Sequence, residues 1–574
     1  MCGIVGYIGK NKALPILING LETLEYRGYD SAGVSYVLDN KIHIKKEKGK
    51  LENLKKELDY GTFTYIGIGH TRWATHGKPD NINAHPHNQG KITLVHNGII
   101  ENYEELKKEL DYDFKSQTDS EVIAALLDKL YNGNMLETLV KAKEKLIGSY
   151  ALGILVEGEN KIYAIRKNSP LIIAKSDEGN FLASDVPAIL KYTNKYILLE
   201  QDEIAVLDYD NINFYNDNLK LIDKEVLTFE GNFMDACKDG YEHFMLKEIN
   251  EEPKVFKNTI SVFKNIPDFS KYNKIEIVGC GSAYHAGLIG KNLIEKFANI
   301  ETNVYIASEY RYSKQFHDKN TLVIFISQSG ETADTLACLH KVKEEGIDSL
   351  GIINVVSSAI AREVTNVIYT KAGCEIAVAT TKAYLSQVTV LALIALKLAN
   401  IDIESIDDIE LLPNKIEKLI NIDYSKIVNK LYKNNDVYFL GRGIDYSIAQ
   451  EGSLKLKEIS YIHSEAYASG ELKHGTIALI NENTPVIYIS TDKSLNDKTI
   501  SNVKEVKARG AYVIGVSTFY NDVCDDIILV DEVSPFLQPI LTVIPLQMIA
   551  YNIAKLKGCD IDKPKNLAKS VTVE

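Results

Sequence analysis

Met1-Cys2-Gly3-Ile4-Val5-Gly6 opens the chain, and its interpretation decides the fold expected for the residues that follow. With the initiator methionine removed, Cys2 carries both a thiol and a free α-amino group. A terminal amine has an ordinary pKa of about 7.7–8.0, so it can accept the thiol proton near neutral pH. The same residues also describe an apolar first strand in which cysteine is a small buried side chain. Six residues alone favour the packed strand, and the segments below reverse that interpretation.

The composition is that of a globular protein with several domains. The chain has 574 residues, 45% hydrophobic and 25% charged, and this length predicts about two to four domains. The net charge of −13 argues against nucleic acid or a membrane surface as a partner. We therefore expect a protein that acts on small molecules.

The cysteines and the N-terminus predict a cytoplasmic location. Seven cysteines are scattered without a CxxC pair, which fits a reducing compartment and no disulfide framework. No basic segment precedes an apolar run at the N-terminus, as a signal peptide would require. The apolar stretch at 388–399 contains Lys397 and is too short to span a bilayer.

Short apolar runs predict a sheet-rich domain in the first 210 residues. Candidate strands cover residues 4–8, 33–38, 42–45, 66–69, 92–96, 151–156, 161–165, 171–174 and 204–207. Candidate helices cover residues 13–24, 103–110, 122–130 and 135–146. Because many of these strands come in adjacent pairs, we expect antiparallel sheets with helices packed outside.

A histidine-rich segment follows one of the strands. It begins with Gly-His-Thr-Arg-Trp-Ala-Thr-His-Gly at 69–77, and five of the twelve histidines lie here or just beyond: His70, His76, His85, His87 and His96. A metal site is one interpretation, but no cysteine and only one acid, Asp80, accompany the imidazoles. A loop that binds a small polar substrate fits better, with Arg72 gripping a carboxylate.

Two further segments carry candidate chemistry. Asn97-Gly98 after a strand is most often a turn, but an amide and a neighbouring backbone N–H also suit an oxyanion hole. Thr118 and Glu121 have the spacing of a helix capping box. Asp119 between them is then available for a substrate ammonium group.

In this order, CGIVGYIG, LEYRGYDSAG, GHTRWATHG, NAHPHN, VHNGIIEN and QTDSEV resemble the glutaminase domain of class II glutamine amidotransferases. The resemblance implies an N-terminal-nucleophile fold, a four-layer αββα sandwich, and attack by mature Cys2 on the glutamine side-chain amide. It implies that Asn97 and Gly98 stabilise the oxyanion. Glutamine-binding residues implied in the same way are Arg27, Arg72, His76 and Asp119.

The second half of the chain contains an internal repeat. Residues 275–281, IEIVGCG, match 437–443, VYFLGRG, at an offset of 162 positions, and 321–327 match 484–490 at an offset of 163. A third strand follows in each copy, at 349–355 and 512–516. Strands alternate with helices, so each copy is predicted to be a doubly wound α/β unit with a parallel sheet.

Only the first copy has a predicted phosphate site. Its strand ends in Ser327-Gln328-Ser329-Gly330-Glu331-Thr332. Hydroxyl groups, a flexible glycine and a helix N-terminus bind an anion without a metal. The second copy has Ser-Thr-Asp-Lys-Ser at 490–494 instead. It has no glycine and an added acid, so one phosphate is expected, not two.

Three more groups near the end of the chain are candidates for chemistry. Glu451, Lys455 and Glu458 share one face of a predicted helix, where a solvated salt-bridge ladder is the ordinary interpretation. His474 lies in a loop. Lys569 lies in the C-terminal tail and, if desolvated, is a candidate for an imine with a carbonyl substrate.

With MLKEINEEP, ELKHG and NLAKSVTVE, these segments resemble the sugar isomerase (SIS) domains of the glutamine–fructose-6-phosphate aminotransferase family. The resemblance implies a homodimer without a cofactor or metal. It implies that Lys569 forms the imine, Glu458 moves a proton between C1 and C2, Lys455 supports it, and His474 of the neighbouring subunit assists ring opening. Trp73 would gate an ammonia channel. Fructose 6-phosphate would contact Ser282, Ser327, Gln328, Ser329, Thr332, Val378, Thr380 and Ala568.

Three positions depart from the family pattern: Ala283 and Thr380 replace serine, and Lys565 replaces arginine. Thr380 keeps its hydroxyl, whereas Ala283 loses a possible sugar contact. The expected domains are a glutaminase at 2–222, a linker at 223–255, SIS domains at 256–402 and 403–562, and an active-site tail at 563–574.

Two competing functions fit the sequence less well. A paralogous fructosamine-phosphate deglycase would tend to lack a competent N-terminal cysteine, which this chain has. A non-catalytic sugar-phosphate sensor would not need Lys569, Glu458 and His474 together with an intact glutaminase.

Overall fold

The computed structural model describes residues 2–229, 237–356 and 358–572. The chain divides into two compact units. One is Met1–Cys237 with Ala568–Glu574, and the other is Lys238–Leu567. Residues 230–236 of the expected linker, Met1, and the last two residues of the expected tail lie outside the described residues.

The first unit contains two antiparallel sheets. In spatial order, the eight-stranded sheet is β15 (Leu227–Thr228), β11 (Lys195–Leu198), β9 (Ile172–Lys175), β10 (Gly179–Ala183), β1 (Gly3–Gly9), β4 (Ile66–Arg72), β2 (Ser31–Leu38) and β3 (Lys41–Lys48). The seven-stranded sheet is β14 (Leu221–Ile222), β13 (Ile212–Tyr215), β12 (Ile204–Leu207), β8 (Ile162–Lys167), β7 (Gly148–Val156), β6 (Ile92–Ile100) and β5 (His87–Gln89).

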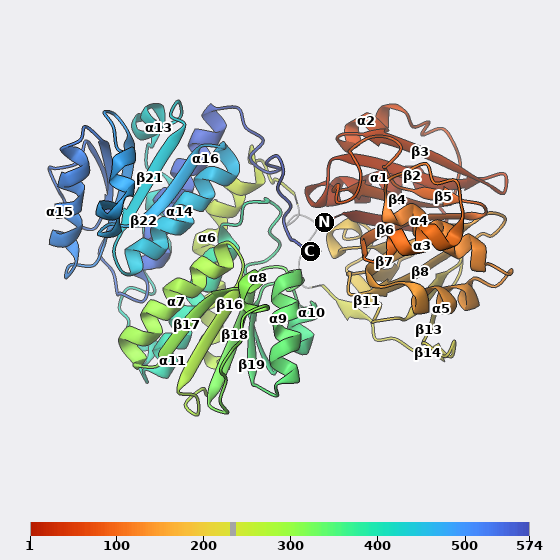
Figure 1. Cartoon of the computed structure of the whole chain (residues 1–574), viewed down its shortest axis with the longest axis horizontal. Helices are drawn as coiled ribbons and strands as arrows, with labels where there is room; N and C mark the ends of the chain where they lie inside the picture. Colours follow the sequence, from red (N-terminus) through yellow and green to blue (C-terminus); the bar gives the residue numbers. More distant parts are fainter. Residues whose placement is uncertain (1, 230–236, 357, 573–574) are drawn as a thin grey trace. The chain divides into compact units, whose positions relative to one another are not determined.

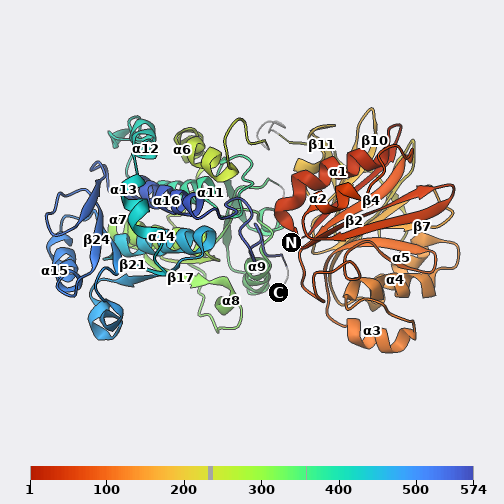
Figure 2. The same cartoon turned by 90° about the horizontal axis from the view of Figure 1, so that it is seen from above.

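Helices cover the outer faces of both sheets. α1 (Ala13–Leu24) packs on β1 and β4, with α2 (Leu51–Lys56) nearby. α3 (Tyr103–Leu110), α4 (Asp119–Leu130) and α5 (Met135–Lys145) cover the other sheet. Apolar side chains such as Ile4, Val95 and Leu182 fill the space between the sheets. The predicted αββα sandwich is thereby confirmed, and Figure 2 shows its layers from α1 down to α3.

The second unit contains two five-stranded parallel sheets with the same strand order. The first is β17 (Glu301–Ile306), β16 (Lys274–Gly279), β18 (Thr321–Ser327), β19 (Ser349–Ile353) and β20 (Asn366–Tyr369). The second is β22 (His463–Ala468), β21 (Asp436–Gly441), β23 (Pro485–Ser490), β24 (Tyr512–Ser517) and β25 (Asp526–Leu529). The repeat inferred from the sequence is therefore confirmed as a structural duplication.

The duplication extends to the turns that start the first helix of each copy. α7 (Ser282–Ala298) follows Gly281, with φ 54° and ψ −127°, and α14 (Ile444–Ser460) follows Gly443, with φ 57° and ψ −127°. Positive φ is a conformation that glycine adopts without the Cβ penalty. Both glycines thus bring a helix N-terminus to the carboxyl end of the preceding strand, β16 or β21, where α/β proteins form their sites.

One apolar core joins the two copies. It combines residues of α6 (Phe244–Ile260), α7, α11 (Lys382–Leu398), α12 (Leu412–Ile420), α13 (Ser425–Leu431), α14 and α16 (Gln538–Leu556). The opposite faces are covered by α8 (Ala307–Tyr310), α9 (Ala333–Glu344) and α10 (Ala359–Glu363) in the first copy and by α15 (Asn496–Lys507) in the second. Both sheets are doubly wound, as predicted (Figure 1).

Among the helices in the described part of the chain, one, α16, is long enough and apolar enough to cross a membrane, judged by length and composition alone. The apolar stretch at 388–399, noted from the sequence, belongs instead to α11 and the residue that follows it. Of the qualifying window of α16, 83% is buried inside the unit. The helix is therefore accounted for as a core element of the second unit.

Candidate functional site

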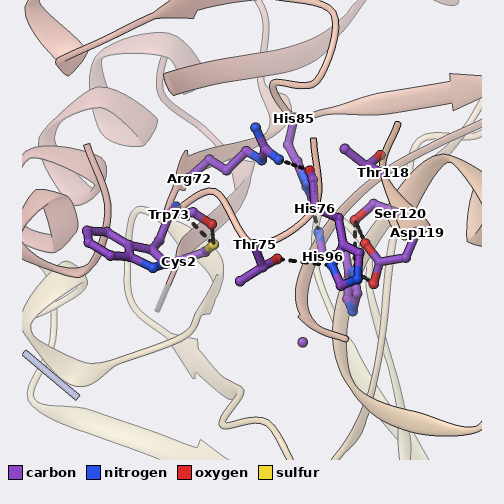
Figure 3. Close-up of a pocket in the computed structure, with 11 residues that line it drawn as sticks. Cys2, Arg72, Trp73, Thr75, His76, His85, His96, Thr118, Asp119 and Ser120 are labelled. Carbon is purple, nitrogen blue, oxygen red and sulfur yellow. Dashed lines mark hydrogen bonds and ion pairs between the residues drawn. The ribbon is translucent and has the colours of Figure 1, made fainter. Parts of the chain in front are cut away.

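Cys2 opens a pocket at one end of the two sheets of the first unit. Gly3 pairs with Thr71, so the start of β1 lies beside the end of β4 and the loop after Arg72. In Figure 3, Cys2 and Trp73 lie on one side, and Asp119 and Ser120 lie on the other. The lining residues are Cys2, Arg72, Trp73, Thr75, His76, His85, His96, Gly98, Thr118, Asp119 and Ser120.

The Cys2 thiol is held by the backbone of Trp73. The Trp73 N–H donates to Cys2 Sγ at 3.2 Å, and the thiol lies 3.6 Å from the Trp73 carbonyl oxygen. Desolvation raises the pKa of the Cys2 thiol, while the Trp73 N–H and the Arg72 guanidinium oppose that shift. A thiol in this setting needs a nearby base to become a nucleophile.

Asn97 and Gly98 come from β6, on the facing sheet. Asn97 Nδ2 donates to the Cys2 carbonyl oxygen at 2.9 Å. Gly98 has φ 140°, and a Cβ there would lie 2.0 Å from the Ser149 carbonyl oxygen. Only glycine fits this backbone. The Asn97 amide thus lies against the backbone of Cys2, and Gly98 lines the same pocket as the thiol, as an oxyanion hole built from these two residues requires.

Asp119 lies at the far end of the pocket as the first residue of α4. It is buried, and its Oδ2 accepts the Ile100 N–H at 2.9 Å. Thr118 caps the helix by accepting the Glu121 N–H at 3.3 Å, which confirms the cap. The Glu121 carboxylate bonds instead to the N–H groups of Ser116 and Lys115, at 2.6 and 3.0 Å. A full capping box would also need the Glu121 carboxylate to accept the Thr118 N–H, so that part of the prediction is wrong.

The other predicted glutamine-binding residues occupy different positions. Arg72 is buried and donates to the carbonyl oxygens of His76, Gly77 and Lys78. In this structure its guanidinium therefore organises the loop that closes the pocket. Arg27 pairs with Asp185 at 2.5 Å and is not among the residues that line this pocket.

The histidines of the first unit pack against one another. The rings of His70 and His85 stack with centroids 4.0 Å apart, and His85 meets His87 edge-on at 4.7 Å. Burial lowers the pKa of His70 to about 3 and lowers that of His85, His87 and His96. Among the described residues, no group of three or more His, Cys, Asp or Glu could hold a metal ion.

The predicted phosphate loop joins β18 to α9. Ser327 Oγ accepts the Gly330 N–H at 3.0 Å and lies 3.0 Å from Thr332 Oγ1. The Glu331 N–H donates to Ser329 Oγ at 3.2 Å. Gly330 has φ 64°, and a Cβ there would lie 1.9 Å from Ser358 Oγ. The loop is therefore tight and gathers its hydroxyl groups at the carboxyl end of a parallel strand.

The charged face of α14 is buried. Glu451 and Lys455 have side chains that are 1% exposed, so the solvated ladder considered from the sequence is wrong. Lys455 Nζ lies 2.6 Å from Glu458 Oε2 and 3.5 Å from Glu451 Oε1. Ser282 and His285, both on α7, donate to Glu451 at 2.8 Å. Although burial alone would lower it, the two carboxylates raise the pKa of Lys455.

The segment that carries Val378 and Thr380 is fixed by two buried glutamates. Glu248 Oε1 accepts the N–H groups of Ile376 and Ala377, at 2.5 and 3.1 Å. Thr380 Oγ1 donates to Glu375 Oε2 at 2.7 Å. The hydroxyl that Thr380 retains is thus committed to Glu375 in this structure.

Three predicted sugar-site residues differ from the buried residues of α14 described above: one is exposed, and two belong to the segment grouped with the first unit. His474 is exposed in the short helix η6 (Glu471–His474). Ala568 and Lys569 are half-buried and belong to the segment grouped with the first unit. Their roles remain predictions.

In the second copy a carboxylate occupies the loop that corresponds to the phosphate loop. Asp445, which matches Ala283, accepts the Thr491 N–H at 2.8 Å and the Thr491 hydroxyl at 2.5 Å. Burial raises the pKa of Asp445 to about 6. A second phosphate would meet this carboxylate, which is consistent with the prediction of a single phosphate.

Sequence reasoning missed Thr75, Ser120 and His285 as members of these sites. Thr75 and Ser120 lie beside predicted residues, inside GHTRWATHG and QTDSEV, and that adjacency was the available signal. His285 lies one helical turn from Ser282. Its contact with Glu451 is 166 residues away in sequence, so local spacing carried no trace of it.

Family models match both halves of the chain. A glutamine amidotransferase domain matches residues 70–191, and a SIS domain matches twice, at 268–397 and 430–556. A glutamine–fructose-6-phosphate aminotransferase (isomerizing) of Clostridium acetobutylicum is 49% identical, and that of Aquifex aeolicus is 46% identical. Both alignments cover 100% of each chain.

Solved structures resemble the second unit. The C-terminal domain of glucosamine-fructose-6-phosphate aminotransferase from Francisella tularensis is 39% identical. It covers 57% of this chain and 99% of its own, with a TM-score of 0.52. A phosphosugar isomerase from Silicibacter pomeroyi, described as putative in its title, is 21% identical with a TM-score of 0.50; it covers 56% of this chain and 100% of its own. The second comparison supports the fold alone.

Proposed function

Because the chain belongs to the glutamine–fructose-6-phosphate aminotransferase family, we propose that it converts L-glutamine and D-fructose 6-phosphate into L-glutamate and D-glucosamine 6-phosphate. Glutamine hydrolysis supplies ammonia, and amination of the ketose with isomerisation consumes it. The product would enter hexosamine synthesis. The single observation that carries the glutaminase half is that Asn97 Nδ2 bonds to the backbone of Cys2, in whose pocket Gly98 and Asp119 are lining residues.

The first half-reaction follows from the groups in that pocket. After Met1 is removed, the α-amine of Cys2 takes the thiol proton, and Sγ attacks the side-chain amide carbon of glutamine. Negative charge develops on the amide oxygen, where Asn97 Nδ2 and the Gly98 N–H donate. The C–N bond breaks, ammonia leaves with the proton, and water hydrolyses the thioester to glutamate. Asp119 would hold the substrate ammonium group, and His76 would line the site.

Arg72 would have to give up existing hydrogen bonds in order to bind glutamine. Its guanidinium donates to three loop carbonyls, so it would bind the glutamine α-carboxylate only by exchanging some of these bonds. Trp73 lies next in the chain and would gate the passage of ammonia. Arg27 would act through Asp185 and thus support the wall of the site indirectly.

The second half-reaction uses the other unit. Ser327, Gln328, Ser329 and Thr332 would bind the phosphate, with Ser282, Val378, Thr380 and Ala568 around the sugar. Lys569 would form an imine at C2 with loss of water, and ammonia would then replace the lysine at C2. Glu458 would move a proton between C1 and C2, with its charge compensated by Lys455 at 2.6 Å. These steps involve no net oxidation.

A homodimer in the cytoplasm completes the proposal. His474 is exposed in its own chain, which suits a residue that acts in the site of a second subunit. Analytical ultracentrifugation should give twice the chain mass of 64.2 kDa. A monomer with full synthase activity would exclude a trans role for His474.

The test of the N-terminal mechanism is intact-mass spectrometry of the active protein. The expected mass lacks Met1. Full activity in a preparation that retains Met1 would exclude the Cys2 α-amine as the base.

A further inference from the structure

The orientation of the Asn97 amide is set from outside the pocket. One N–H of Nδ2 donates to the Cys2 carbonyl oxygen at 2.9 Å, and Oδ1 lies 3.1 Å from His70 Nε2. His70 Nε2 also lies 3.0 Å from the His96 carbonyl oxygen. A carbonyl oxygen only accepts, so the proton of neutral His70 resides on Nε2. The donor on His70 then requires Oδ1, not Nδ2, on its side of the Asn97 amide.

We infer that His70 is a positioning residue for glutamine hydrolysis: its Nε2–H fixes the Asn97 amide so that N–H groups face Cys2. This inference rests on the proposed glutaminase function. His70 is not among the residues that line the pocket, and its Nε2 contacts Asn97 Oδ1 at 3.1 Å, so its effect on the reaction passes through Asn97. Without this donor, the bond from Nδ2 to the Cys2 carbonyl oxygen alone sets the orientation of the amide. The amide then turns more readily and presents its oxygen to the developing oxyanion, which replaces attraction by repulsion.

The surroundings of His70 favour this one tautomer. The ring is buried on β4 and stacks on His85 with centroids 4.0 Å apart. His85 is fixed in turn, because its Nδ1 accepts the His96 N–H at 3.3 Å. Nδ1 of His70 is buried without a hydrogen-bond partner in the structure. A second proton on Nδ1 would create a buried imidazolium whose Nδ1–H has no acceptor, which costs free energy. The imidazole thus acts as a fixed, neutral donor.

The experiment compares variants of His70 in the full-length protein. His70→Leu removes the donor, whereas His70→Gln places an amide N–H near the position of Nε2. Thr93→Val is the matched control, since Thr93 is buried on β6, the strand of Asn97, and bonds to Asn88 instead. For each variant, kcat and KM for glutamine hydrolysis are measured together with the thermal unfolding of the protein.

His70→Leu should lower kcat on the order of 10²-fold, comparable with the loss of one oxyanion donor, with little change in KM. His70→Gln should recover most of that loss, and Thr93→Val should retain the wild-type kcat. In an Asn97→Ala background, His70→Leu should cause no further loss, because the two residues act as one unit. Alkylation of Cys2 by iodoacetamide, which forms no oxyanion, should proceed at the wild-type rate in His70→Leu.

The outcomes separate this inference from the proposed function. A wild-type protein that does not hydrolyse glutamine contradicts the proposed function itself. An active wild type with His70→Leu equal to Thr93→Val overturns the role of His70, as does an additive loss in the Asn97→Ala background. If His70→Leu does not fold, ¹⁵N spectra of histidine-labelled wild type decide the matter. A neutral His70 protonated on Nε2 supports the inference, and an Nδ1–H tautomer or an imidazolium overturns it.

Discussion

Asn97 Nδ2 lies 2.9 Å from the carbonyl oxygen of Cys2, although 95 residues separate the two in sequence. The bond joins the facing sheets of the first unit, because Cys2 precedes β1 and Asn97 lies on β6. The nucleophile and its oxyanion donor are thus fixed to each other by the sandwich itself. This relationship makes the glutaminase half sensitive to small changes at either residue.

Replacement of Asn97 by alanine tests the oxyanion hole. Asn97→Ala should lower kcat for glutamine hydrolysis about 10²–10³-fold, because one preorganised donor is lost in the transition state. The KM for glutamine should change little, since the substrate amide needs that donor less. Steady-state kinetics measures both. An equal rise in KM with an unchanged kcat would mean that Asn97 only binds the substrate.

Acid should destabilise the first unit through its buried histidines. Burial holds the pKa of His70, His85, His87 and His96 below the ordinary 6.5. Below about pH 6.5, unfolded imidazoles therefore take up protons that folded ones do not, and stability falls with decreasing pH towards about 3, the pKa of His70. Each such histidine contributes a slope of about 1.4 kcal/mol per pH unit.

Calorimetry in buffers of different ionisation enthalpy counts these protons. At pH 5.5, unfolding of the first unit should be accompanied by net proton uptake that disappears above pH 8. Proton release at pH 5.5, or a melting temperature independent of pH between 5 and 7, would contradict neutral buried histidines.

Gly330 tests the phosphate loop with a matched control. Gly330 and Gly346 have similar φ, 64° and 70°, but a Cβ at Gly330 would lie 1.9 Å from Ser358 Oγ, whereas Gly346 has open space. Gly346→Ala should cost about 1 kcal/mol of stability for the left-handed backbone alone. Gly330→Ala should cost more and weaken fructose 6-phosphate binding at least about tenfold, or about 1.4 kcal/mol.

Isothermal titration calorimetry gives the dissociation constants of both glycine variants. The same affinity for fructose 6-phosphate in Gly330→Ala and Gly346→Ala would place the sugar phosphate elsewhere.

Asp445→Asn should stabilise the protein above neutral pH. Burial raises the pKa of Asp445 from 3.8 to about 6. The folded state therefore binds the Asp445 proton more tightly than the unfolded state does. The free energy of unfolding falls as the pH rises from 3.8 through about 6, and the total loss above that range is about 3 kcal/mol. The asparagine removes the charge but can still accept the Thr491 N–H. Melting temperatures at pH 8 and pH 4.5 check this prediction: the gain should be large at pH 8 and small at pH 4.5, and a loss at pH 8 would contradict it.

Local patterns predicted the elements better than the contacts between them. Adjacent pairs of apolar runs predicted antiparallel sheets with helices outside, and the family resemblance implied the four-layer sandwich. The near-constant offset between the two copies predicted the duplicated parallel sheets. No local pattern predicted α16, whose apolar residues are spread around the helix instead of gathered on one face.

The candidate sites show where sequence reasoning stops. Cys2, Asn97, Gly98 and Asp119 were selected by residue type and position. In the structure Cys2, Gly98 and Asp119 line one pocket, and Asn97 bonds to the Cys2 carbonyl oxygen. The bond from His70 to Asn97, the pairing of Arg27 with Asp185, and the burial of Glu451 depend on tertiary packing. No local spacing encodes such contacts.

The central claim is that glutamine nitrogen released at Cys2 is built into an amino sugar phosphate by the same chain. The most direct test incubates the purified protein with glutamine labelled with ¹⁵N in its side-chain amide and with fructose 6-phosphate, and analyses the products by mass spectrometry. The expected result is ¹⁵N-labelled glucosamine 6-phosphate and unlabelled glutamate in equal amounts. Cys2→Ala should form neither product but should still bind fructose 6-phosphate. Absence of labelled glucosamine 6-phosphate from the active wild type, or its formation by Cys2→Ala, would contradict the claim.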